Sequence, residues 1–99
     1  MTDMKSLVLL EFQKSFQNAR NKNMSDLAPS AIGDHPLLLD TLRAIDGKTS
    51  SVDDASAALS RRADELEALA ASCRTSPEWG DICVAMGAVR NAAVAVWRG

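Results

Sequence analysis

The chain has 99 residues, of which 46% are hydrophobic and 24% are charged, and its formal net charge is −2. This length suffices for one modest core and is too short for a second, so we expect residues 1–99 to form a single domain. The slightly acidic balance gives no electrostatic reason to expect nucleic acid or an anionic membrane as a partner. Alanine is abundant and tyrosine is absent, which favours closely packed helices over a β-sheet.

The first predicted element is a helix over about residues 3–21, with Thr2 or Asp3 as its N-cap. At 100° per residue, its apolar side chains form one continuous face. That face consists of Val8, Leu9, Phe12, Phe16 and Ala19. We therefore expect this helix to pack one side against the rest of the protein.

A second apolar area lies on the other side of this helix, where Leu7 and Leu10 fall near Met4. Soluble monomers seldom leave such a contiguous area open, so we predict that Met4, Leu7 and Leu10 bind a partner. The simplest partner is a second copy of the chain, which gives a homodimer with this helix in its interface. The alternative is that the segment 37–39 folds back and covers these side chains within one chain.

The middle of the chain is interrupted by three helix-breaking residues, Pro29, Gly33 and Pro36. After them the sequence predicts a short helix over about residues 36–45, capped by Asp34 and ended by Asp46-Gly47. The three leucines at 37–39 leave a short strand as the alternative, although a single strand has no obvious partner.

Gly47-Lys48-Thr49 resembles the end of a phosphate-binding loop, and it is the motif in this chain that most suggests a nucleotide. Such a loop needs a glycine five positions before Gly47, and Leu42 stands there. It also needs a strand before it and a helix directly after it, and the sequence predicts neither. The same segment lacks the first ligands of a calcium-binding loop. We therefore predict a polar linker.

A long helix is predicted over about residues 52–73, with Ser51 and Asp54 spaced as in a capping box. Its apolar residues recur at steps of three and four, which indicates one buried face. The predicted stripe comprises Val52, Ala55, Leu59, Leu66, Leu69 and Cys73.

A second long helix is predicted over about residues 77–97, with Ser76 as N-cap and Pro77 at the first helical position. Its heptad seam comprises Trp79, Ile82, Met86, Val89, Ala93 and Val96. A parallel row of small side chains, which lets another helix approach closely, comprises Ala85, Ala88, Ala92 and Ala95. The short connection between the two long helices predicts an antiparallel hairpin.

The reactive side chains form no recognisable catalytic or metal-binding pattern. Cys73 and Cys83 show no CxxC spacing, and both fall on or beside apolar stripes, where free cysteine acts as a small hydrophobe. His35 is the single histidine, and Asp34 beside it is no evidence of triad geometry. We therefore predict no catalytic residue, no cofactor, no metal and no small-molecule substrate.

Together these patterns predict an all-α fold, a small helical bundle of three to four helices built on a C-terminal antiparallel helical hairpin. The expected function is that of a non-enzymatic protein-interaction module, such as a regulator, inhibitor, adaptor or chaperone-like subunit, that acts through an apolar helical surface. The alternative is a small DNA-associated regulator that uses the basic N-terminal segment, which carries Lys5, Lys14, Arg20 and Lys22.

The N-terminal sequence fits neither a secretory signal nor a membrane span, because its apolar run covers only four residues and has an acidic residue on either side. We therefore expect a cytoplasmic protein, and export by a route that needs no cleaved signal stays open.

Overall fold

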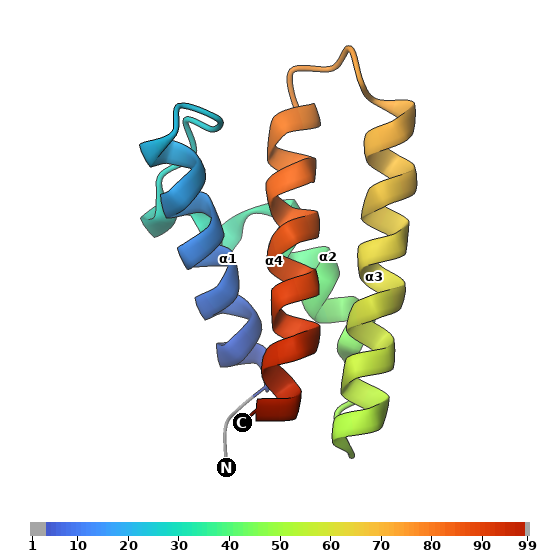
Figure 1. Ribbon diagram of the computed structural model, residues 1–99. Helices are drawn as coiled ribbons and strands as arrows, with labels where there is room; N and C mark the ends of the chain where they lie inside the picture. The colour runs from blue at the N-terminus through green and yellow to red at the C-terminus, as the bar shows by residue number, and fades with distance from the viewer. Residues whose placement is uncertain (1–3, 99) are drawn as a thin grey trace.

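The computed structural model describes residues 4–98, apart from the side chain of Pro29. Over this range the chain forms four α-helices and one 3₁₀-helix, and no strand. In chain order these are α1 (Met4–Asn21), the 3₁₀-helix η1 (Pro29–Asp34), α2 (Pro36–Ile45), α3 (Val52–Ser72) and α4 (Trp79–Arg98). Helices α1, α4 and α3 lie side by side, and α2 crosses behind them (Figure 1). The predicted all-α bundle with a C-terminal helical hairpin is confirmed.

Helix α1 buries most of the predicted face, with Val8, Phe12, Phe16 and Ala19 in the core and Leu9 half-buried. The rings of Phe12 and Phe16 stack with their centroids 6.3 Å apart. The helix ends where Met24 donates its backbone N–H to the Ala19 carbonyl. The N-cap expected at Thr2 or Asp3 lies outside the described residues.

Helix α2 occupies the predicted range, and its three leucines are helical rather than extended. The cap, however, is His35 and not Asp34, because the unpredicted helix η1 extends through Asp34 and leaves His35 as the extended residue before α2. His35 Nδ1 accepts the backbone N–H of Leu37 at 3.1 Å. Gly47, with φ of +73°, provides the expected turn after α2 because glycine adopts this backbone conformation without a steric penalty.

Helix α3 begins as predicted, with Ser51 Oγ accepting the backbone N–H of Asp54 at 3.1 Å. Its buried face is richer in alanine than the predicted stripe, and it comprises Ala55, Ala58, Leu59, Ala63, Leu66 and Ala70. Val52 and Leu69, which were expected in this face, are exposed. Leu69 lies about 60° around the helix from Leu66, at the edge of the contact rather than in it.

Helix α4 begins at Trp79, two residues later than predicted. Ser76 Oγ accepts the backbone N–H of Glu78 at 3.2 Å, and the Ser76 carbonyl accepts that of Trp79 at 3.1 Å. These bonds close a turn around Pro77, so the first bond of α-helical spacing runs from Ile82 to Glu78. Trp79, the first residue of α4, is exposed.

The remaining seam positions of α4 are buried at Ile82, Val89, Ala93 and Val96, whereas Met86 is half-buried.

Two sides of α4 are buried because it lies between α3 and α1 (Figure 1). On the α3 side, Ser56 Oγ donates to the Ala93 carbonyl at 3.3 Å. On the α1 side, Ser25, which follows α1, donates through Oγ to Asp81 Oδ1 at 2.7 Å. The residues four, seven and eleven positions after Asp81 are Ala85, Ala88 and Ala92, all fully buried. The predicted alanine row is therefore the α1 side of α4, and its fourth residue, Ala95, is half-buried.

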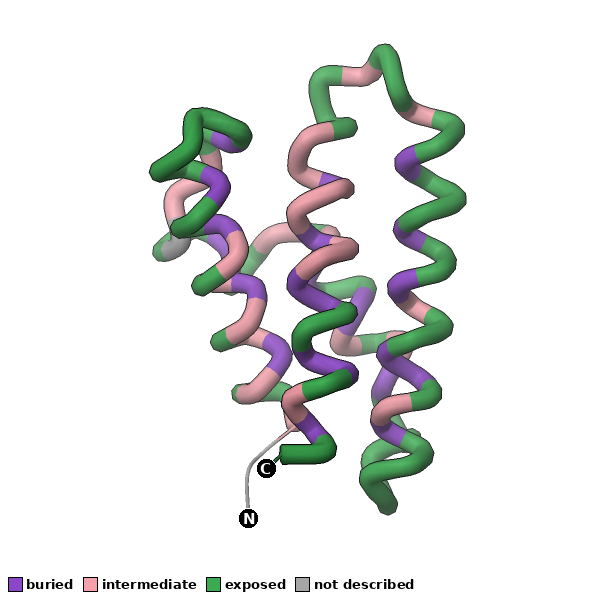
Figure 2. Tube along the Cα trace, in the orientation of Figure 1, coloured by how far each residue is buried: buried purple, intermediate pink, exposed green. Residues whose placement is uncertain are grey.

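Figure 2 shows the buried positions of α1 and α3 along the sides that these helices turn toward α4. Within residues 4–98, no helix combines the length and the apolar composition that a membrane span requires.

Candidate functional surfaces

The structure separates the three residues that the sequence singles out for partner binding. Met4 and Leu7 are half-buried and pack against the core, whereas Leu10 is 46% exposed. Ser6 and Lys14 lie four residues from Leu10, Gln13 lies three and Gln17 seven, so most of its neighbours along α1 are polar, whereas Leu7, three residues before it, is apolar. Leu10 by itself is a single exposed apolar side chain, which is common on soluble proteins.

The outward side of α4 carries two more exposed apolar side chains, Val94 at 52% and Trp97 at 61%. They are three residues apart and therefore neighbours on the helix surface. The indole N–H of Trp97 donates to Ser56 Oγ of α3 at 3.0 Å. This bond holds the ring across the junction of α3 and α4 while most of it faces solvent.

These side chains gather at one end of the bundle. Helices α1 and α4 run antiparallel, so the first turn of α1 lies at the same end as the last turns of α4 (Figure 1). Met4, Leu7, Val94 and Trp97 at this end are referred to below as the terminal surface, with Trp97 on the α3 side of α4 and Met4 and Leu7 on α1, on the other side of α4. The sequence analysis singled out Met4 and Leu7 but not Val94 and Trp97. Val94 belongs to none of the predicted apolar stripes, and Trp97 follows Val96, the last position of the predicted seam.

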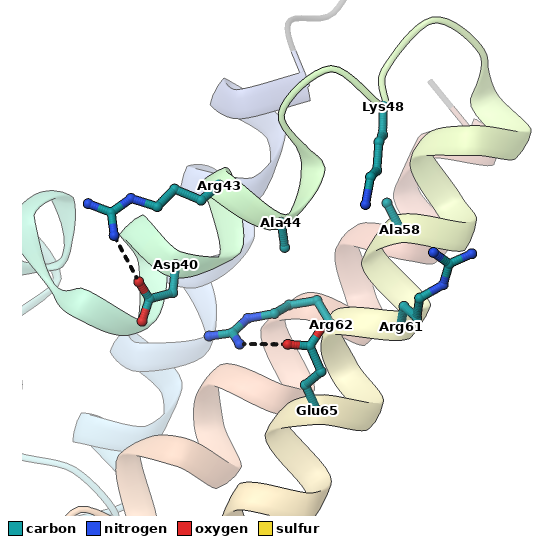
Figure 3. A pocket seen from close by; sticks show the side chains of 8 residues that line it. All are labelled: Asp40, Arg43, Ala44, Lys48, Ala58, Arg61, Arg62 and Glu65. Carbon is teal, nitrogen blue, oxygen red and sulfur yellow. Dashed lines mark hydrogen bonds and ion pairs between the residues drawn. The ribbon is translucent and has the colours of Figure 1, made fainter.

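A hollow of about 440 Å³ lies between α2 and α3 (Figure 3). Its lining side chains come from both helices and from the linker between them, and they are Asp40, Arg43, Ala44, Lys48, Ala58, Arg61, Arg62 and Glu65. The hollow is shallow and open to solvent, and four of its lining side chains are cationic.

Arg62 is the fixed element of this hollow. Its side chain is only 11% exposed, its Nε donates to Thr41 Oγ1 at 3.1 Å, and its terminal nitrogen pairs with Glu65 at 3.5 Å. Thr41 is itself buried and donates through Oγ1 to the Leu37 carbonyl at 2.7 Å. This chain of hydrogen bonds ties α2 to α3. Sequence patterns do not reveal it, because Arg62 shows there only as an interruption of an apolar spacing.

A second hollow, of about 370 Å³, lies between the end of α1 and the start of α4. Ser25 is buried there, and its Oγ donates to Asp81 and also accepts the backbone N–H of Leu27 at 3.2 Å. Gly80 approaches the chain after α1 so closely that a Cβ at this position would lie 3.2 Å from the Met24 carbonyl oxygen. These contacts hold the α1 end against α4 and give the region a structural role.

The side chains considered for chemistry remain apart. His35 Nδ1 is occupied as a helix cap, and Cys73 and Cys83 are free and half-buried. Among residues 4–98, no group of three His, Cys, Asp or Glu side chains is placed to hold a metal ion.

The basic residues of the N-terminal segment do not form one patch. Lys14 pairs with Glu11 at 3.7 Å, and Arg20, six residues later, lies on a different side of α1. Lys22 follows the helix in a turn.

Comparison with protein-family models, curated proteins and solved structures gives no match to this chain.

Proposed function

We propose that this protein is a non-enzymatic interaction module, a regulator or adaptor, that binds another protein chain through its terminal surface. The observation that carries the proposal is Trp97, a large aromatic side chain that is mostly exposed and yet fixed by a hydrogen bond to Ser56. Tryptophan is enriched among the residues that dominate the binding energy of protein interfaces.

Fixing the indole before binding supports this role. A side chain already held in one orientation loses less conformational freedom when a partner covers it, so more of the gain from burial remains as affinity. Val94 beside it adds an apolar contact, and the half-buried Met4 and Leu7 extend the same end of the bundle. A surface built on two packed helices is also rigid, which limits the cost of ordering on binding.

The proposed occupant is a second copy of this chain. In a two-fold pairing each copy presents the same surface, so every apolar contact occurs twice and a small patch gains area. Val94 lies on a long regular helix, and two such helices can pack along their outward sides.

The proposal places the module in the cytoplasm and assigns it no catalytic step. Two free, half-buried thiols fit a reducing compartment. The cap formed by His35 gives the single histidine a structural use, which supports a binding role rather than catalysis.

The test compares Val94→Asp with Leu69→Asp by sedimentation velocity from micromolar to millimolar concentration. Leu69 is a matched control because it is an exposed apolar residue within a long helix and lies outside the terminal surface. We expect the wild type and Leu69→Asp to dimerise with rising concentration, and Val94→Asp to remain a folded monomer because a charge in an apolar contact is costly to desolvate. A wild type that stays monomeric at millimolar concentration, or equal dimerisation of both variants, contradicts the proposal.

A further inference from the structure

The hollow between α2 and α3 brings together four cationic side chains from three segments of the chain. Arg43 belongs to α2, Lys48 to the linker, and Arg61 and Arg62 to α3. Asp40 and Glu65 are the acidic residues of its lining. The lining therefore carries two more positive than negative charges, on a chain whose formal net charge is −2.

The two acidic residues already have partners. Asp40 pairs with Arg43 at 3.4 Å, and Glu65 pairs with Arg62 at 3.5 Å. Figure 3 shows both arginines turned toward these carboxylates. Lys48 and Arg61 make no ion pair with any described residue, so the excess positive charge of the hollow resides on these two side chains.

Lys48 contributes a cationic side chain to the hollow from the linker between α2 and α3. Its side chain extends from the linker toward Ala58, and Arg61, three residues after Ala58 on α3, also lines the hollow (Figure 3). Ala44 and Ala58 contribute an apolar floor between the charged groups. An occupant that matches this lining has an anionic group and a small apolar body.

We propose that this hollow is a binding site for a phosphate monoester, with Lys48 and Arg61 as its phosphate ligands. A phosphate monoester carries between one and a half and two negative charges at about pH 7, which matches the two unpaired cations, whereas a carboxylate carries one. Guanidinium and ammonium groups are the side chains that most often bind phosphate oxygens. The volume of about 440 Å³ exceeds that of a phosphate group and leaves room for an organic body over Ala44 and Ala58.

This site differs from the phosphate-binding loop that Gly47-Lys48-Thr49 resembles. There the backbone N–H groups of a glycine-rich loop surround the phosphates and a helix begins directly behind them. Here α2 precedes the linker, and the backbone N–H of Lys48 is already bonded to the Ile45 carbonyl at 3.0 Å. In the proposed site, Lys48 contacts the phosphate through its side chain, and the second phosphate ligand is Arg61 of α3.

The experiment titrates the wild-type chain with phenyl phosphate at low ionic strength and follows backbone amide signals by NMR. We expect concentrated shifts at residues 42–49 and 58–65, which weaken as salt is added because the interaction is between exposed charges. Shifts spread evenly over basic residues of the whole surface overturn the proposal.

The double variant Lys48→Ala/Arg61→Ala should bind phenyl phosphate about tenfold more weakly, which is the expected loss when two charge-assisted contacts are removed. Both side chains are exposed, so the fold should be kept, and the two single variants provide intermediate steps. The control is Lys22→Ala/Arg74→Ala, which removes the same charge from exposed positions outside the hollow. Equal weakening in both double variants shows general charge attraction and overturns the proposal.

Two further probes define the ligand. Benzoate has the same ring with a single charge, and it should bind about tenfold more weakly than phenyl phosphate; equal affinity overturns the assignment to phosphate.

A phosphoserine tripeptide tests whether the phosphoryl group comes from a free small molecule or from a phosphorylated protein. Binding weaker than that of phenyl phosphate assigns the site to a free small molecule, and tighter binding assigns it to a phosphorylated protein; either result supports the phosphate site.

Discussion

The two buried sides of α4 are built differently. Toward α3, α4 meets a buried face made of leucine and alanine, of which Leu59 and Leu66 are the larger members. Toward α1, α4 presents fully buried alanines, while the buried face of α1 carries Phe12 and Phe16. The α3 contact joins neighbours in sequence, whereas the α1 contact joins the two ends of the chain.

The two contacts of α4 therefore fill the core with side chains of different sizes. Two phenylalanine rings require space, and a row of small side chains on α4 provides it by letting α1 approach closely. The hairpin instead packs Leu59 and Leu66 of α3, set among alanines, against α4. Loss of volume should therefore be costly on both sides, and gain of volume should be worst on the alanine side.

Phe12→Asp tests the α1 contact and should have the largest effect. Phe12 is fully buried, so the change removes a large apolar contact and places a charge where nothing pairs with it. We expect the chain to be unfolded at 25 °C by circular dichroism. Asn18→Asp, at an exposed position of the same helix, should stay folded. A cooperative thermal transition in Phe12→Asp would show that α1 is dispensable for the hairpin.

Leu66→Ala tests the hairpin contact. Leu66 is fully buried, and its truncation should lower the free energy of unfolding by about 2–5 kcal/mol through lost burial and a residual cavity. The matched control is Leu69→Ala, the same change three residues later at an exposed position, which should cost less than about 1 kcal/mol. Urea denaturation measures both. Similar losses in the two variants would mean that the helix is rotated from the orientation described.

Ala88→Leu tests whether the contact between α1 and α4 tolerates added side-chain volume. Ala88 is fully buried in the row that faces α1, so the larger side chain should push α1 away and cost about 1–3 kcal/mol in urea denaturation. Ala68→Leu makes the same change at an exposed position of α3 and should be almost neutral. If Ala88→Leu is neutral as well, the contact between α1 and α4 contains unfilled space.

The helices themselves were largely predictable, because their signals are local. Ser51 caps α3 as its spacing with Asp54 indicates, and the periodicity of Ile82, Val89 and Val96 located the buried seam of α4. The alanine row was visible too, but periodicity cannot say which helix such a row meets. The hydrogen bond between Ser25 and Asp81, which lie far apart in sequence, identifies α1 as the helix that this row meets.

The errors lie where one local signal competes with another. Asp34 is a good capping residue, but η1 incorporates it and leaves the cap to His35. Pro77 suits the first turn of a helix, yet Ser76 closes a tight turn around it and delays α4 to Trp79. The candidate surfaces were hardest to predict, because the hollow collects Arg43, Lys48 and Arg61 from three segments.

Leu10→Asp should have the smallest effect and sharpens the distinction between the inner and outer sides of α1. Leu10 is exposed and most of its neighbours on the helix are polar, so the free energy of unfolding should change by less than about 0.5 kcal/mol. Leu7→Asp provides the contrast, because Leu7 packs partly against the core and its replacement by a charge should be clearly destabilising in the same urea experiment.

Sedimentation velocity of Leu10→Asp tests whether Leu10 belongs to the proposed dimer interface. Dimerisation that is unchanged in Leu10→Asp confines the interface to the terminal surface, whereas a folded, monomeric Leu10→Asp extends it along the outer side of α1. If Leu10→Asp instead unfolds the chain, Leu10 belongs to the core of the monomer, and the outer side of α1 is not free to bind a partner.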